Sequence, residues 1–594
     1  MEFEQKAEEK KMSMSKNIAR LAVTAGLTAA LSFGGVMAPV TMAFAENVAA
    51  PANSITINKN ANNGSVKYKA YQIFEADVVD ETGKTDKVVS NVKWATGVKE
   101  ATRKAIINAI NKKQDGALKA DASPQDVANW LTANITGTTN TTVLKDTDLL
   151  NTLAGLVAKD VTPTNPTNPT GITDGSFAAD TKVSFDKSGY YLFLTDEGTL
   201  PSDESKTDSK NTATSPIYAV VGAGPVTVNE KTSIPTVNKQ VLDDTAGKTV
   251  DTAVEGDWKN VGDAWIGQEI DYKLTGTVAS NIASYGEYTY EFQDHLSAGL
   301  AADLSSIVVT INGKKINASG FYTATVEDTF DGSNNKTGQD LKVSFKDLKA
   351  AAKSVDENLD GDSKVVVTYR AQLTSDAEYT AAGNTNKVKL VYSNNPMSTG
   401  TGTSESKEVT DYVFGFNITK TDPKDSSAKL VAGFKVKMIK EGETKKVAKW
   451  LKQDGSFTDE ENKAYTFKTN GENNTVSIPG LVAGTYLISE SETPAGYNTI
   501  ADFEITVTPT YNPTTGKLTD LEVAATSDMV AAHLDKKDDS TKIPVTIQNK
   551  KGSGLPLTGL NGVTFTWIAG GAVLCIGVAH LIRSRKQAEE SEQE

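Results

Sequence analysis

Cysteine and histidine are scarce in this sequence, with one cysteine and three histidines among 594 residues. The cysteine, Cys575, lies in an apolar run near the carboxyl end, so the rest of the chain cannot form an internal disulfide. The chain has no GxSxG motif and no cluster of residues at metal-ligand spacing. These absences argue against a hydrolase, a metal centre and a cofactor site, and predict a protein that is not an enzyme.

Basic residues are also fewer than acidic ones, with 61 lysines and arginines against 75 aspartates and glutamates. The formal net charge is -14, which argues against a nucleic-acid partner because the phosphate backbone attracts basic surfaces. The length is enough for several domains.

Long apolar runs are confined to the two ends of the chain. The amino-terminal run ends in Ala43-Phe44-Ala45, which resembles a signal-peptidase site, and it follows basic residues at Lys10, Lys11, Lys16 and Arg20. Residues 1–45 are therefore predicted to be a signal peptide, and the mature chain is expected to start near Glu46. The acidic leader before Met12 is unusual for a signal peptide, so Met12 or Met14 is an alternative start.

The carboxyl-terminal run, Val563–Ile582, contains no acid, lysine or arginine. It is about long enough to cross a bilayer as a helix. Basic residues follow it at Arg583, Arg585 and Lys586. We therefore predict a membrane span with a short cytoplasmic tail.

Just before this span lies the pentapeptide Leu555-Pro556-Leu557-Thr558-Gly559. Pro556 favours an extended backbone that fits a protease-like groove. The order of pentapeptide, span and basic stop, over residues 553–594, resembles the cell-wall sorting signal of Gram-positive surface proteins. This resemblance implies that a sortase cleaves between Thr558 and Gly559 and passes the threonyl acyl group to an amine.

The region between the two ends is rich in short alternating runs broken by turn residues, which is typical of stacked all-β domains. Residues 46–230 are predicted to form a mixed domain, with a helix near 147–160 and a proline-rich loop at 162–171 that excludes a central strand. Residues 231–410 and 411–552 are predicted to form immunoglobulin-like β-sandwiches. The predicted fold class is mainly β.

Polar residues recur at core-facing positions of both predicted sandwiches, because every second side chain of a strand faces the same side. In the last block the polar members are Lys420, Glu490 and Asn549, which share strand faces with Phe414, Phe416 and Ile418, with Tyr486 and Ile488, and with Ile543, Val545 and Ile547. In the middle block they are Lys239, Asp294 and Asn386, which share faces with Val237 and Val241, with Tyr288, Tyr290 and Phe292, and with Val388, Leu390 and Tyr392. Each sandwich thus buries a lysine, an acid and an asparagine.

Burying these groups unpaired costs several kcal/mol. One interpretation is a buried salt bridge with an asparagine nearby, or strand-end residues that reach solvent. The other is chemical: desolvation favours the neutral amine and the protonated acid. A neutral amine is a nucleophile, and the acid can transfer protons as ammonia leaves the asparagine. The product is a Lys–Asn isopeptide bond.

The stretch "GTYLISESETPAGY" is similar to the glutamate box of collagen-adhesin B-type domains, through Tyr486, Leu487, Glu490, Pro494, Gly496 and Tyr497. The resemblance implies that Glu490 promotes a bond between Lys420 and Asn549. The middle block resembles the A-type isopeptide domain of pilin backbones, which implies that Asp294 promotes a bond between Lys239 and Asn386.

Two alternatives remain in the middle block. Asn384 competes with Asn386, and Asp271 competes with Asp294. We prefer Asp294 because Asp271 lies on the face opposite the apolar residues beside it, Ile270, Tyr272 and Leu274.

The segment "GPVTVNEKTSIPTVNK" places Lys231 at an interdomain edge, between Val226 and Val228 on one side and Pro235 on the other. It resembles the pilin motif of sortase-assembled fimbriae, although it lacks the aromatic residue and the Tyr-Pro of the commonest version. The resemblance implies that Lys231 is the amine that accepts the next subunit. The alternative is a solvated linker lysine.

Together these features predict a major, shaft-forming subunit of a covalently polymerised fimbria on the cell surface. The expected partners are a sortase, identical subunits, minor or tip pilins, peptidoglycan and an unknown receptor that supports adhesion. The alternative is a wall-anchored adhesin that is never polymerised, and a functional Lys231 distinguishes the two.

Overall fold

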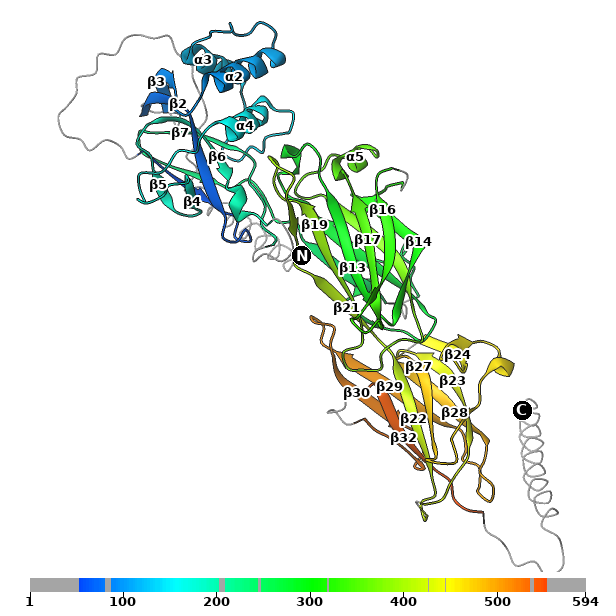
Figure 1. Ribbon diagram of the computed structural model, residues 1–594. Coiled ribbons are helices and arrows are strands. Elements are labelled where there is room, and N and C mark those ends of the chain that lie inside the picture. Colours follow the sequence, from blue (N-terminus) through cyan, green and yellow to red (C-terminus); the bar gives the residue numbers. More distant parts are fainter. Residues whose placement is uncertain are drawn as a thin grey trace, which may run out of the picture.

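The computed structural model describes residues 53–80, 87–201, 209–243, 247–317, 320–425, 427–443, 445–534 and 539–552. These residues form three β-rich modules that follow one another along an elongated molecule (Figure 1). The predicted signal peptide, the LPLTG pentapeptide, Cys575 and the predicted span lie outside the described residues. Among the helices that are described, none combines the length and apolar character needed to cross a membrane.

The first module has three layers. A sheet of order β3-β2-β6-β7, with β4 beside β2, has helices on one face and a second sheet of order β5-β1-β8 on the other. Strand β6 is buried along its whole length because both its faces are covered, and its sequence GYYLFLT is correspondingly apolar. The elements are β1 (Ser54–Asn58), β2 (Lys67–Asp80), β3 (Lys87–Trp94), α2 (Glu100–Lys113), α3 (Pro124–Asn134), α4 (Leu149–Asp160), β4 (Ser176–Ala178), β5 (Lys182–Ser184), β6 (Gly189–Thr195), η1 (Glu197–Thr199), β7 (Ile217–Val221) and β8 (Pro225–Asn229).

The middle module is a sandwich of two sheets. Their orders are β10-β9-β12-β18-β14-β15 and β11-β21-β19-β13-β17-β16, with β20 beside β19. The elements are β9 (Val237–Leu242), η3 (Glu255–Asp257), β10 (Trp258–Lys259), β11 (Val261–Asp263), β12 (Glu269–Thr277), η4 (Ile282–Ser284), β13 (Tyr290–Ser297), β14 (Leu300–Ile311), β15 (Lys314–Lys315), β16 (Thr323–Phe330), β17 (Lys336–Phe345), α5 (Leu348–Lys353), β18 (Lys364–Leu373), β19 (Asn384–Ser393), β20 (Thr401–Thr403) and β21 (Lys407–Tyr412).

The last module is a second sandwich, with sheet orders β27-β22-β32-β31 and β25-β24-β23-β28-β29-β30, and with β26 beside β23. Strands β22 and β32 pair in parallel, so the first and last strands of the module lie side by side. The elements are β22 (Phe414–Thr421), β23 (Gly433–Glu441), β24 (Lys445–Leu451), β25 (Phe457–Thr458), η5 (Glu461–Lys463), β26 (Phe467–Lys468), β27 (Thr475–Leu481), β28 (Gly484–Glu492), β29 (Phe503–Tyr511), β30 (Leu518–Ala525), β31 (Val530–Ala532) and β32 (Lys542–Gln548).

The first and middle modules are joined through buried polar side chains. Asn281 donates to the carbonyl of Ala213 at 2.9 Å, and the Ser284 hydroxyl donates to the carbonyl of Leu144 at 2.6 Å. Asn394 donates to the carbonyl of Pro201 at 3.1 Å. These three side chains are almost completely buried, so hydrogen bonds that are shielded from water hold the two modules together.

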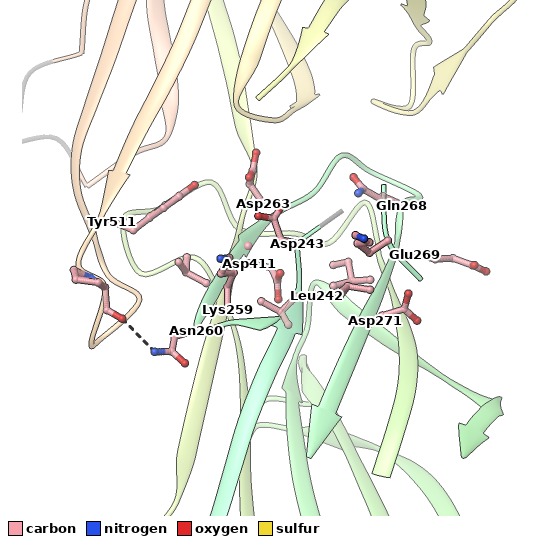
Figure 2. A pocket seen from close by; sticks show the side chains of 16 residues that line it. Leu242, Asp243, Lys259, Asn260, Asp263, Gln268, Glu269, Asp271, Asp411 and Tyr511 are labelled. Atoms are coloured by element: carbon pink, nitrogen blue, oxygen red, sulfur yellow. Dashed lines mark hydrogen bonds between the residues drawn. The ribbon is translucent and has the colours of Figure 1, made fainter. Parts of the chain in front are cut away.

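The middle and last modules meet around a pocket that residues of both modules line (Figure 2). Asn260 donates to the carbonyl of Pro513 at 3.2 Å, and the hydroxyl of Tyr379 accepts from the backbone of Gly480 at 2.9 Å. The rings of Trp265 and Phe457 pack edge to face at 5.6 Å. Backbone pairing, aromatic packing and side-chain hydrogen bonds therefore all cross this junction.

The predicted fold class is confirmed: the chain is mainly β, with helices in the first module. The predicted helix near 147–160 is α4, and the proline-rich loop at 162–171 contains no strand beyond one isolated bridge.

We predict opposite outcomes for two glycine substitutions in the first module. A Cβ on Gly189, which has φ of +142°, would lie 2.0 Å from the carbonyl oxygen of Phe74, whereas a Cβ on Gly155 in α4 meets nothing within 4 Å. Gly189→Ala should destabilise the module by about 3 kcal/mol, and Gly155→Ala should stabilise it by up to about 1 kcal/mol. Urea unfolding followed by limited proteolysis measures both, and equal behaviour of the two variants would contradict the packing described for β6.

Candidate cross-link sites and acceptor lysine

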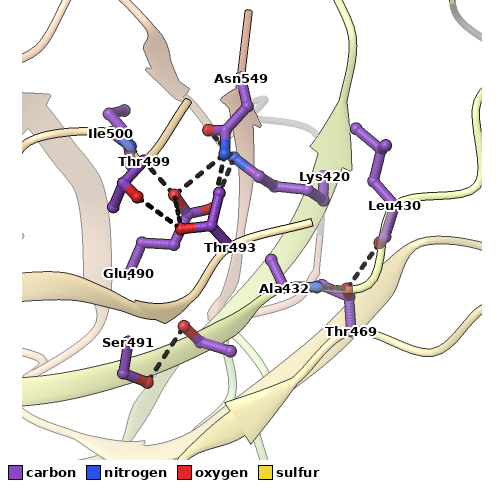
Figure 3. Close-up of polar contacts among 11 residues, drawn as sticks. Lys420, Leu430, Ala432, Thr469, Glu490, Ser491, Thr493, Thr499, Ile500 and Asn549 are labelled. Carbon is purple, nitrogen blue, oxygen red and sulfur yellow. Dashed lines mark hydrogen bonds and ion pairs between the residues drawn. The ribbon is translucent and has the colours of Figure 1, made fainter. Parts of the chain in front are cut away.

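The last module brings Lys420, Glu490 and Asn549 together in its core (Figure 3). Lys420 is on β22, and Asn549 directly follows β32, the parallel neighbour of β22. Glu490 is on β28 of the opposite sheet. Lys420 is 0% exposed, Asn549 1% and Glu490 7%. All three predicted residues therefore meet in the core, and Glu490 faces the other two across the sandwich.

The contacts among these groups form a closed triangle. The Lys420 amine donates to Oδ1 of Asn549 and lies 3.4 Å from Oε1 of Glu490. The amide nitrogen of Asn549 donates to both carboxylate oxygens of Glu490, at 2.8 and 2.9 Å. Glu490 also accepts from the backbone of Ile500 at 3.0 Å. The nucleophile, the carbonyl group and the acid thus touch directly.

Burial lowers the pKa of Lys420 to about 8, against the opposing effect of Glu490, which favours the charged amine. Desolvation dominates because the ammonium form loses its water shell in the core. Near neutral pH the ammonium form still predominates, but the neutral amine, adjacent to the Asn549 carbonyl, is far more populated than in an exposed lysine.

The middle module contains the corresponding cluster of Lys239, Asp294 and Asn386. Lys239 is on β9 of one sheet, and Asp294 and Asn386 are on the neighbouring strands β13 and β19 of the other. Each of the three is at most 2% exposed. The Lys239 amine lies 2.6 Å from both carboxylate oxygens of Asp294.

A tyrosine completes this second cluster. The hydroxyl of Tyr369 donates to Oδ2 of Asp294 at 2.6 Å. It accepts from the Lys239 amine at 3.1 Å and from the Asn386 amide nitrogen at 2.7 Å. Burial lowers the pKa of Lys239 to about 8, again against the effect of its acid partner, and raises the pKa of Tyr369 well above its ordinary value.

The two competing residues of the middle module lie elsewhere. Asn384 is buried, but its amide bonds to the backbone of Glu378 and Asp411. Asp271 is half-buried and lines the junction pocket, as Figure 2 shows. The geometry therefore favours Asn386 and Asp294 as the reacting pair with Lys239.

Lys231 lies just after β8, at the carboxyl end of the first module. It lines a small pocket with Thr138, Thr142, Pro216 and Tyr218. Burial lowers the pKa of Lys231 to about 8, and no carboxylate within the described chain forms an ion pair with it.

The carboxylate of the neighbouring Glu230 is directed toward Asn60 and Asn63. It accepts from the backbone of Asn60 at 2.8 Å and from the side chain of Asn63 at 2.6 Å. Burial raises the pKa of Glu230 to about 7. Lys231 is thus a half-buried amine whose adjacent acid is engaged inside the first module.

Tyr369 was not among the residues predicted from the sequence. The sequence feature that could have indicated it is its position in the alternating run of β18, where Val365, Val367 and Ala371 share its buried face. A tyrosine at such a position needs a partner for its hydroxyl.

Residues 415–520 match the family model of the SpaA prealbumin-like fold domain. The matched range lies in the last module and includes Lys420 and Glu490, and Asn549 lies beyond it. Among curated proteins, the trypsin-resistant surface T6 protein of Streptococcus pyogenes serotype M6 is 25% identical over 280 residues, which are 46% of this chain and 46% of the relative. The chain therefore spans about half the length of the curated relative that it matches.

Two solved structures align with most of this chain. The T6 backbone pilin of serotype M6 Streptococcus pyogenes has a TM-score of 0.47 and 15% identity, over 84% of this chain and 98% of that one. The major pilin SpaA of Corynebacterium diphtheriae has a TM-score of 0.39 and 13% identity, over 84% of this chain and 100% of that one.

We predict that the amine of Lys231 titrates with a pKa of about 8 in the folded protein. As the pH rises through this value the ammonium loses its proton, so its reaction with trace acetic anhydride should reach half its maximum near pH 8. In the urea-unfolded chain the midpoint should return to about 10.4. Peptide mass spectrometry after competitive labelling reads both values, and identical midpoints in the two states would contradict the burial of this amine.

Proposed function

We propose that this protein is the structural shaft subunit of a covalently polymerised surface fimbria. The single observation that carries the proposal is the half-buried amine of Lys231, which lines a pocket of the first module with a lowered pKa and no acid partner among the described residues. A lysine in this state is a ready acceptor for an acyl group. The LPLTG pentapeptide at residues 555–559 supplies a donor of that kind in the same chain.

In the proposed assembly, a sortase cleaves between Thr558 and Gly559 of one subunit. The threonyl carbonyl is then joined to the Lys231 amine of the next subunit. Repetition makes a fibre, and the last acceptor is an amine of peptidoglycan. Minor or tip pilins and a surface receptor are further expected partners, and the exported chain is not itself an enzyme.

Tension in such a fibre enters each subunit near Lys231 and leaves after the last module. We propose that two internal isopeptide bonds, Lys239–Asn386 and Lys420–Asn549, lie on this route. Each joins the first strand of a sandwich to a late strand, so the load passes through covalent bonds instead of separating strands. The first module then lies outside the direct path of tension.

We predict that the purified mature protein has lost two ammonia molecules relative to its sequence mass. Glu490→Ala should leave Lys420 and Asn549 unjoined, so one ammonia molecule fewer is lost. The bond would close a loop of 129 residues, and its absence should lower the free energy of unfolding by about 4 to 5 kcal/mol on the chain-entropy model. Intact mass spectrometry and thermal unfolding measure the two effects.

Glu492→Ala is the matched control. Glu492 follows Glu490 by two positions on β28 and pairs with Lys468 at the surface. Its replacement should preserve both bonds and change stability by less than about 1 kcal/mol. A wild-type protein with unshifted mass would refute the proposed cross-links.

We predict that wall extracts boiled in detergent give a high-mass ladder and that Lys231→Ala abolishes it. Monomer should still reach the wall, because the LPLTG donor is intact. Lys182→Ala, an exposed lysine on β5 of the same module, should leave the ladder unchanged. An undiminished ladder from the Lys231→Ala strain would transfer the acceptor role to another lysine.

The alternative function is a wall-anchored adhesin that is not polymerised. Tandem mass spectrometry of wall-linked material separates the two. A branched peptide joining Thr558 to Lys231 supports the shaft, whereas threonine joined only to peptidoglycan supports the adhesin.

A further inference from the structure

The hydroxyl of Tyr369 lies at the centre of the middle cluster. Its ring stacks on Tyr272 at 5.3 Å and is 1% exposed. One hydroxyl donates once and accepts twice, and all three positions are filled by Asp294, Lys239 and Asn386. The contacts of this hydroxyl are therefore limited to the acid and the two groups that react.

The acid and the asparagine of this cluster do not touch. No hydrogen bond joins Asp294 to Asn386 in the part of the chain that the structure describes. Tyr369 instead connects them, accepting from the amide nitrogen and donating to the carboxylate. In the last module Glu490 reaches the amide nitrogen of Asn549 directly, at 2.8 Å. Aspartate is one methylene shorter than glutamate, and the tyrosine hydroxyl spans the difference.

The side-chain amide of Asn386 is held by a hydrogen bond from its nitrogen, the atom that would leave as ammonia. Its nitrogen donates to Tyr369, while its buried carbonyl oxygen has no hydrogen-bond partner among the described residues. The nitrogen that departs as ammonia is thus the one that contacts the hydroxyl.

We propose that Tyr369 is a catalytic residue of the middle module, relaying a proton from Asp294 to the leaving nitrogen of Asn386. This inference depends on the proposed Lys239–Asn386 bond.

In the proposed reaction, the Lys239 ammonium first gives one proton to Asp294 and becomes a neutral amine. The amine attacks Cγ of Asn386, and the Nζ–Cγ bond forms. Tyr369 gives its proton to Nδ2 and recovers one from Asp294, while Nζ gives a second proton to the carboxylate. The Cγ–Nδ2 bond breaks, ammonia leaves, and an amide remains beside a neutral, protonated Asp294.

Cell-free synthesis of the full chain tests this relay. Samples are quenched in acid at intervals, digested, and assayed for both cross-linked peptide pairs by mass spectrometry. Tyr369→Phe should slow formation of the Lys239–Asn386 bond on the order of 100-fold, the scale of general acid–base catalysis. The Lys420–Asn549 bond should form at the wild-type rate, because it has a separate acid in the same molecule.

Tyr290→Phe is the matched control. Tyr290 is buried in the same core and donates to the carbonyl of Thr277 at 2.9 Å. Its loss removes a tyrosine hydroxyl without altering the cluster, so both bonds should form at the wild-type rate. Asp294→Ala gives the reference for a folded but unjoined middle module.

If the Lys239–Asn386 bond forms at the wild-type rate in Tyr369→Phe, the proposed relay is refuted. If that variant fails to fold, as protease sensitivity would reveal, Tyr369 is replaced by 3,5-difluorotyrosine, which keeps the ring and hydroxyl but makes the hydroxyl more acidic. A changed joining rate then supports the relay, and an unchanged rate refutes it. A wild-type chain that never joins Lys239 to Asn386 would refute the proposed bond itself, which is a separate result.

Discussion

An ammonium group that is removed from water loses hydration worth several kcal/mol, even when an acid lies beside it. Lys239 and Lys420 both occupy the centre of a sandwich, and burial lowers the pKa of each to about 8 despite the adjacent carboxylate. The attraction within a salt bridge alone does not offset this loss of hydration well. The proposed isopeptide bond removes the charge permanently, because a neutral amide replaces the ammonium and the acid no longer needs to balance it. The close packing of both cores keeps water away from this chemistry.

The two sandwiches assemble the same groups by different routes. In the last module the lysine and the asparagine share one sheet, on a parallel strand pair, and the glutamate reaches them from the other sheet. In the middle module the lysine faces the acid and the asparagine across the sandwich, and Tyr369 fills the space between. Glu490 contacts the Asn549 amide directly, whereas the hydroxyl of Tyr369 lies between the shorter Asp294 and the Asn386 amide.

Strand alternation was enough to place the six polar residues in the two cores, because every second residue of β22, β28 and β32, and of the corresponding middle strands, is apolar and buried. Alternation also separated Asp271 from Asp294. It gave no account of Tyr369, since an aromatic residue on a buried face is equally suited to packing. The module junctions were not predictable either. Asn281, Ser284 and Tyr379 lie outside regular strands, where no periodicity indicates which groups they meet.

Lys231 differs from the two core lysines in one respect that decides its chemistry. Burial lowers all three pKa values to about 8, so each amine is partly neutral. Lys239 and Lys420 each have an acid and an asparagine within reach, and their reaction partner belongs to the same module. Lys231 lines a pocket of threonines, Asn140, Tyr218 and apolar groups, and the neighbouring Glu230 bonds to Asn60 and Asn63 instead. Under the proposed assembly, the acyl group that reacts with this amine therefore comes from another subunit.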